Sequence, residues 1–225
     1  MLDRLKVIFL LFCLTVSGGC RSIPFRNIDY VSLENVDPAT RLADFKATLA
    51  QKLEIINSIV FEYKWHSLAA LGYTQLDLEN NTFKVSCINP VGIKLFELTG
   101  SRDEVKPVFV LKELLQRGDL PRAVGEDIRR IYFDFTPAQD AKVKKEKYRI
   151  IFTQNTGNGK LKYIFAGPQA WLIEKHYYEG KRNIWSVFYY DYLKEQGKLY
   201  PSALILKHRR FGYNLIIRLK EVRLK

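Results

Sequence analysis

The sequence predicts an α+β protein built on one large antiparallel sheet with helices against one face. From Ile56 onward, many short segments alternate apolar and polar residues with a period of two, which is typical of strands. Turn sequences such as residues 79–81 and Glu179-Gly180 separate these segments, and short turns favour antiparallel neighbours. Helical spacing of apolar residues recurs in only three places. We therefore expect ten strands and three helices.

The amino terminus has the layout of an export signal. Arg4 and Lys6 precede an apolar run over residues 7–16, and small residues then lead to Cys20. The run is too short to span a bilayer, which takes about 20 residues. We predict a lipoprotein signal peptide over residues 1–19. The alternatives are an ordinary signal peptide followed by a chance cysteine, or an uncleaved anchor.

The Ser17-Gly18-Gly19-Cys20 ending resembles the lipobox of bacterial lipoproteins. The resemblance implies that Cys20 is lipidated and becomes the first residue of the mature chain, anchoring it to a membrane. Arg21 follows the cysteine, and by the same resemblance this favours sorting to the outer membrane. Residues 20–40 are polar and irregular and contain two prolines, so we expect a lipid-anchored tether there, followed by one folded domain over residues 41–225.

Composition narrows the class of partner. The chain is 47% hydrophobic and 27% charged, which permits a buried core, and its formal net charge is +12. A basic balance suggests nucleic acid, an anionic membrane surface or an acidic ligand. An exported protein meets little nucleic acid, so we predict no nucleic-acid partner and retain anionic lipid, lipopolysaccharide or acidic proteins.

The first half of the chain begins with a predicted helix. Asp37-Pro38 supplies a cap and a first-turn proline, and Leu42, Phe45, Leu49 and Leu53 follow at helical spacing. The period then changes to two around Phe61, and turns separate the segments that follow. We expect strands over residues 56–65, 68–76, 83–88 and 93–99.

The second half begins with two predicted helices. Val108, Leu111, Leu114 and Leu115 share helical spacing, which stops at Gly118 and resumes after Pro121 up to Tyr132. Residues 142–147 form a charged connection, most simply a solvated loop. We expect strands over residues 148–154, 161–166, 170–178, 184–192, 202–209 and 213–224.

The sheet also predicts a candidate ligand site. Phe, Tyr and Trp number 14, 13 and 3 and concentrate in the strands, and three short helices can leave part of a curved sheet uncovered. A cavity lined by alternating apolar residues would suit an acyl chain. An ordinary core would give the same pattern. The candidate lining comes from two successive strands: Phe61, Tyr63, Trp65, Leu71 and Tyr73.

Sequence signals for catalysis are missing. The chain has no G-x-S-x-G elbow, P-loop, H-E-x-x-H or C-x-x-C motif, and its three histidines fit no zinc spacing. We expect His66, His176 and His208 to be partly exposed strand residues, and Cys87 to be a small core residue rather than a catalytic thiol. The prediction is a protein that is not an enzyme and uses no metal and no cofactor.

The order of elements resembles the LolB-like outer-membrane lipoproteins of the LolA/LolB superfamily: lipobox, tether, helix, a meander carrying Asn89-Pro90-Val91-Gly92, two leucine-rich helices and a second meander. The resemblance implies an unclosed half-barrel whose concave face is covered by an N-terminal helix and a two-helix insertion. By position in the family's Asn-Pro-Leu-Gly turn, it implies that Val91 is a membrane-insertion residue.

The resemblance also implies a function and partners. The expected protein binds acyl chains of lipoproteins or other lipids, receives them from a periplasmic LolA-like carrier and delivers them at the periplasmic face of the outer membrane. The main alternative is a structural or accessory lipoprotein of an envelope complex with a fully packed sheet. An enzyme acting on lipids is the third.

Overall fold

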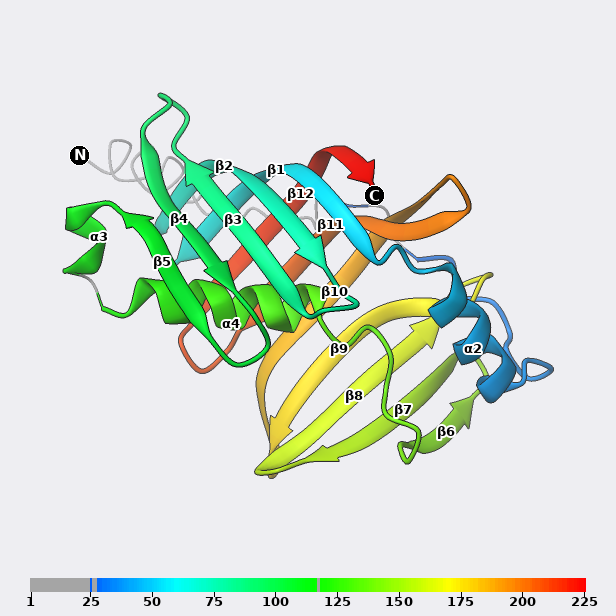
Figure 1. Ribbon diagram of the computed structural model, residues 1–225. Helices are drawn as coiled ribbons and strands as arrows, with labels where there is room; N and C mark the ends of the chain where they lie inside the picture. Colours follow the sequence, from blue (N-terminus) through cyan, green and yellow to red (C-terminus); the bar gives the residue numbers. More distant parts are fainter. Residues whose placement is uncertain (1–24, 26–27, 117) are drawn as a thin grey trace, which may run out of the picture.

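The fold is a single unclosed antiparallel sheet (Figure 1). The computed structural model describes residues 25, 28–116 and 118–225. The twelve strands lie in the order β5-β4-β3-β2-β1-β12-β11-β10-β9-β8-β7-β6, so β5 and β6 are the two edges. The first and last strands pair in the middle of the sheet, Leu53 opposite Leu224 and Tyr63 opposite Tyr213. The strands are β1 (Lys52–Tyr63), β2 (His66–Asp77), β3 (Thr82–Ile88), β4 (Lys94–Gly100), β5 (Val105–Val110), β6 (Lys142–Glu146), β7 (Arg149–Thr156), β8 (Gly159–Ala166), β9 (Trp171–Glu179), β10 (Arg182–Glu195), β11 (Lys198–His208) and β12 (Tyr213–Leu224).

Among the described residues, three helices accompany the sheet: α2 (Pro38–Thr48), α3 (Lys112–Leu115) and α4 (Leu120–Tyr132). The Asp37 carboxylate caps α2 by accepting from the Thr40 backbone N–H at 2.8 Å, as its position before Pro38 predicts. The helix buries Phe45 against the rings of Phe165 and Tyr192. In Figure 1, α2 lies over the half of the sheet that contains β6–β8, and α4 runs along the half that contains β3–β5.

The main core lies on the face of the sheet that the helices cover, here called the inner face. Alternate residues supply it: Leu204 and Leu206 are fully buried in the main cluster, while Ala203 and Ile205 belong to a small cluster on the opposite, outer face. Cys87 joins Phe83 and Val85 on the inner side of β3, and burial raises the pKa of its thiol to about 11. Its predicted role as a small core residue is confirmed.

Apolar residues near the amino terminus pack against the sheet, Phe25 and Ile28 on its outer face and Leu33 in the main core. Phe25 is buried with Ala203 and Ile205, and its ring also contacts Tyr190 and the guanidinium of Arg218. Ile28 packs against the outer side of β7–β9. Leu33 is 1% exposed in the main core, and its N–H donates to the Lys147 carbonyl. Phe25, Ile28 and Leu33, all within the range predicted as a tether, therefore contact the folded domain.

Two segments predicted otherwise are edge strands, which raises the count from ten to twelve. Val105–Val110 pairs with β4 as β5, so the helix expected around Val108–Leu115 shrinks to the single turn α3, which buries no residue. The charged segment expected to be a loop pairs with β7 as β6. Lysines and proline suit edges because they discourage further pairing. Leu53, placed at the end of the first helix by its spacing, instead belongs to β1.

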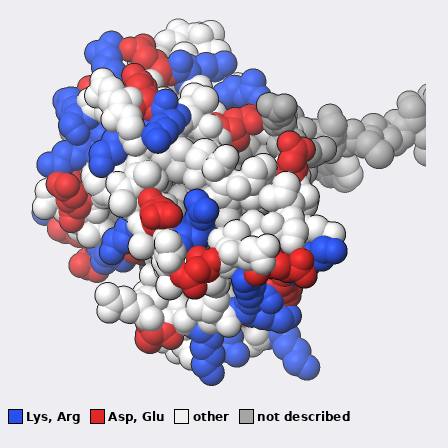
Figure 2. Space-filling view, turned by 90° about the vertical axis from the view of Figure 1, so that its right-hand side faces the viewer, with Lys and Arg blue, Asp and Glu red and all other residues white. Residues whose placement is uncertain are grey.

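The remaining features of the predicted fold are confirmed. The sheet is antiparallel and unclosed, an N-terminal helix covers part of its inner face, and α4 of the two-helix insertion covers another part. No helix among the described residues has the length and apolar character that crossing a bilayer requires. Figure 2 shows basic and acidic side chains interleaved on the side of the molecule that lies to the right in Figure 1. On that side the net positive charge is not gathered into one patch.

Candidate functional site

The candidate site is the inner face of the sheet beneath α4. The Asp119 carboxylate caps this helix by accepting from the Arg122 N–H at 3.1 Å, and Pro121 occupies its first turn. One side of α4 buries Ile128, Ile131 and Tyr132 in the main core, and the other carries charged residues. The amphipathic helix α4 thus separates this part of the apolar inner face from solvent.

Close packing holds α4 against the edge half of the sheet. Gly125 lies against β5 so closely that an added Cβ would lie 2.2 Å from a methyl group of Val105. Ile128 and Ile131 belong to the same cluster as Leu98 and Phe83 of β4 and β3. The apolar surface of these strands would be exposed if α4 moved away.

Polar contacts also hold α4 in place. The Arg129 guanidinium donates to the Ser101 and Glu104 carbonyls of the β4–β5 turn at 2.8 and 3.0 Å. The Tyr213 hydroxyl of β12 donates to the Asp127 carboxylate of α4 at 2.6 Å, and Arg130 of the same helix pairs with this carboxylate at 2.7 Å and orients it. Burial raises the pKa of Asp127 against the opposing influence of these two partners. Each contact can break and re-form without covalent change.

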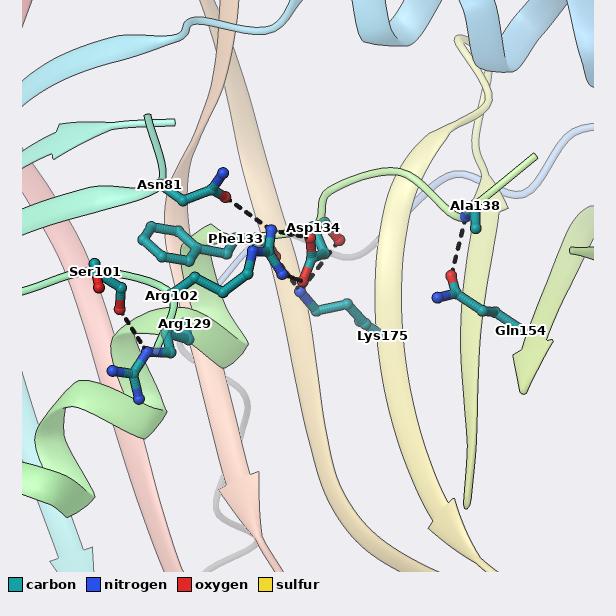
Figure 3. A network of polar contacts seen from close by, with 9 residues as sticks. All are labelled: Asn81, Ser101, Arg102, Arg129, Phe133, Asp134, Ala138, Gln154 and Lys175. Carbon is teal, nitrogen blue, oxygen red and sulfur yellow. Dashed lines mark hydrogen bonds and ion pairs between the residues drawn. The ribbon is translucent and has the colours of Figure 1, made fainter. Parts of the chain in front are cut away.

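The segment after α4 crosses to the other half of the sheet and is fixed at three points (Figure 3). The Arg102 guanidinium donates to both Asp134 carboxylate oxygens at 2.8 and 3.1 Å and to the Asn81 side-chain oxygen at 2.7 Å. The ammonium of Lys175 on β9 donates to the Phe133 carbonyl at 2.7 Å. Further along, the Ala138 N–H donates to the Gln154 side chain.

Lys175 is the most unusual charged residue of the interior. It is 1% exposed and lies near Asp134 and Arg102. Burial lowers its pKa to about 7, while Asp134 acts in the opposite direction. Its ammonium can therefore lose its proton near neutral pH while it remains a donor to the segment that follows α4.

The apolar pocket near α4 is small. It lies between Leu49, Leu53, Tyr132, Phe135 and Tyr200 and holds about 20 Å³, enough for one water molecule. Two more open clefts hold about 310 and 280 Å³, but charged residues, including Lys52 and Lys225, line both. Small-molecule sites occupy roughly 300–1,000 Å³, so the apolar pocket does not offer the space that an acyl chain needs. The hydroxyl of Tyr132 is buried at this pocket without a hydrogen-bond partner among the described residues.

The five predicted lining residues do not share one surface, so that prediction is wrong as a set. Residues directly opposite each other on neighbouring strands point to the same face of the sheet. Each odd-numbered residue of β1 lies opposite an even-numbered residue of β2, as in Tyr63 with His66 and Phe61 with Leu68. Odd-numbered residues of the two strands therefore face opposite sides. Phe61 and Tyr63 lie on the inner face, Leu71 and Tyr73 on the outer face, and Trp65 in the β1–β2 turn, 97% exposed.

The other two predicted site residues have different outcomes. Cys20 lies outside the described residues. Val91 is 79% exposed at the tip of the β3–β4 turn, which the Asn89 side chain organises by accepting from the Val91 and Ile93 N–H groups at 3.1 and 2.9 Å. Gly92 follows with φ +88°, a conformation that favours glycine. Sequence reasoning missed Arg102, Asp134 and Lys175, because no local pattern joins residues so far apart along the chain.

Two of the three histidines differ from their prediction, since His176 and His208 are buried and only His66 is exposed. His176 lies between the Ser186 hydroxyl at 2.7 Å and the Glu174 carboxylate at 2.6 Å, a set that resembles a hydrolase triad in composition. Ser186 is 0% exposed and also bonds to Asn183, so its hydroxyl is not accessible to a substrate in this structure. Among the described residues, no group of three or more His, Cys, Asp or Glu could hold a metal ion.

Comparison with solved structures identifies the fold. A LolA superfamily protein from Nitrosomonas europaea superposes with a TM-score of 0.56 over 84% of this chain and 94% of its own, at 10% sequence identity. A DUF1329 family protein from Desulfovibrio piger gives 0.52 over 83% and 91%, also at 10% identity. No protein-family model matches the sequence, and no curated protein matches it significantly. The chain shares the fold of these two proteins.

Proposed function

We propose that this protein is a lipid-anchored lipoprotein of the bacterial outer membrane whose half-barrel binds acyl chains and passes them to the membrane without covalent chemistry. The observation that carries the proposal is that α4, an amphipathic helix held by non-covalent contacts, covers part of the apolar inner face. When α4 moves away, an acyl chain can replace its buried side chains. Each methylene buried would contribute about 0.8 kcal/mol.

The closed interior determines how binding must occur. Because the pocket near Tyr132 holds about 20 Å³, the proposed carrier opens before it loads. The unpartnered Tyr132 hydroxyl supplies a donor for an ester or amide carbonyl at the head of the chain. The fold shared with a LolA superfamily protein supports this class of ligand. The cargo is then a lipoprotein or another lipid, supplied by a periplasmic LolA-like carrier.

The small size of the apolar pocket also favours a second function. A structural lipoprotein that anchors an envelope complex would need a packed apolar core and no acyl-chain site, and the pocket of about 20 Å³ is compatible with that. The two functions differ in whether α4 can be displaced by ligand. Binding measurements on the same protein distinguish them.

The first prediction is saturable binding of a fluorescent fatty acid to the delipidated protein, with displacement by phospholipid. Displacing α4 costs free energy, so we expect a slow binding phase and a modest affinity. Absence of saturable binding would favour the structural function. Hydrolysis of an ester lipid that is lost in Ser186→Ala would instead show that the protein is an enzyme.

A second prediction concerns Val91. Its side chain is mostly exposed, so Val91→Glu should leave the melting temperature and fatty-acid binding unchanged. If the tip enters lipid, as the LolB resemblance implies, the same variant should transfer cargo to vesicles more slowly, because a carboxylate resists leaving water. Val91→Leu, the matched control, should preserve or increase the rate. A Glu variant with normal transfer would remove this loop from the mechanism.

A further inference from the structure

Five hairpin turns lie along one end of the sheet, and the charged residues within them are all basic. They join β1 to β2, β3 to β4, β7 to β8, β9 to β10 and β11 to β12. We call them the turn rim. Its charged residues are all basic: Lys64, Lys181, Arg209 and Arg210. The turns at the opposite end carry both signs, the acidic residues Glu79, Asp103 and Glu104 together with Arg102 and Lys147.

The turn rim also exposes large apolar side chains. Trp65 is 97% exposed, Phe211 61% and Val91 79%, each at the tip of its turn. The pairing of Tyr63 with Tyr213 places the turns of Trp65 and Phe211 at the same level on neighbouring hairpins. Hairpin axes two strands apart lie roughly 10 Å from each other in a sheet. Lys64 lies beside Trp65, and Arg209 and Arg210 precede Phe211. The Glu179 carboxylate at the end of β9 pairs with Arg210 and neutralises part of the positive charge of that turn.

We propose that the turn rim docks on the head-group region of an anionic phospholipid bilayer, with Trp65 and Phe211 as its anchors. A tryptophan side chain suits the membrane interface, where its ring is apolar and its N–H can still reach a polar partner. Basic residues near an anionic surface add electrostatic attraction. This docking surface is independent of the cargo and adds a second contact to the predicted anchor at Cys20.

Covalent geometry permits the anchor and the rim to reach the same bilayer. Phe25 packs on the outer face beside Ile216 and Arg218. These residues lie three and five positions from Tyr213, where β12 begins at the rim. That interval corresponds to about 10–17 Å along the strand. Cys20 lies five positions before Phe25, a distance of at most about 18 Å along the chain. A lipid on Cys20 can therefore lie in the plane of the rim.

The test uses the full chain reconstituted into vesicles of phosphatidylcholine with phosphatidylglycerol, doped with brominated lipid that quenches tryptophan fluorescence at close range. Trp185 is buried in the body and Trp171 is partly buried, so we expect Trp65 to supply most of the quenching and Trp65→Ser to remove it. The near-complete exposure of Trp65 predicts an unchanged melting temperature. Phe211→Ser should reduce the quenching of the remaining Trp65 by loosening the contact.

Matched controls come from the opposite end of the sheet, where Lys147-Tyr148 repeats the exposed lysine–aromatic pair. Tyr148→Ser and Lys147→Glu should leave quenching unchanged. Lys64→Glu combined with Arg209→Glu should lower it and remove the difference between anionic and pure phosphatidylcholine vesicles. Quenching that persists in Trp65→Ser, or that falls equally in the Tyr148 and Lys147 variants, overturns the proposal. Fatty-acid binding is measured separately, so failure of docking and failure of cargo binding give different results.

Discussion

A disulfide between α4 and β5 is expected to abolish fatty-acid binding until it is reduced. A Cβ at Gly125 would lie 3.3 Å from the Cβ of Val105, close to the roughly 3.5–4.5 Å that a disulfide needs. Val105→Cys also removes the methyl group that the new side chain would meet at 2.2 Å. The oxidised double variant should therefore hold α4 in the closed position.

The expected size follows from the closed interior. If ligand binds only when α4 is displaced, the apparent affinity is proportional to the fraction of molecules in that open state. The disulfide reduces this fraction, and we expect the apparent affinity to fall at least ~10-fold. Each single cysteine variant serves as a control under oxidised glutathione, and reduction should restore binding. Cys87 will not compete, because burial raises the pKa of its thiol to about 11. Unchanged binding in the oxidised variant would mean that ligand does not enter beneath α4.

The second large effect is on the pH dependence of stability. The pKa of Lys175 is about 7 in the folded protein and 10.5 when the side chain is free in water, so above pH 7 the unfolded chain binds more protons at this site. The free energy of unfolding should therefore rise as pH increases. Between pH 7 and 9, we expect Lys175 to raise the free energy of unfolding by about 2–3 kcal/mol.

Urea unfolding at pH 7, 8 and 9 measures this effect. Lys175→Met should remove the rise, whereas Lys162→Met, at a partly exposed position of β8, should retain it. The Met variant also loses the donor to the Phe133 carbonyl, so we expect it to loosen the segment that follows α4. A wild-type protein whose stability stays flat or falls between pH 7 and 9 would contradict the assignment of Lys175.

The sequence alone determined the class of fold. Period-two alternation and short turns predict an antiparallel sheet, because one face of each strand packs on a core and neighbouring strands need only tight connections. The capped helix at Asp37-Pro38 and the helix ending at Tyr132 were also predictable, since caps and apolar spacing are local signals. So was Cys87, whose alternation with Phe83 and Val85 places it on the core side of β3.

Only the tertiary structure decided which residues share a surface. The β1–β2 register turns Leu71 and Tyr73 away from Phe61 and Tyr63, because the turn sets odd-numbered residues opposite even-numbered ones. It also places Trp65 at an exposed tip rather than in a cavity. Pairing with β4 and β7 at the two edges of the sheet turns two segments into the strands β5 and β6, although their local spacing and charge favour a helix and a loop. The contacts of Arg102 with Asp134 and of Lys175 with Phe133 join positions more than 30 residues apart, where no sequence period operates.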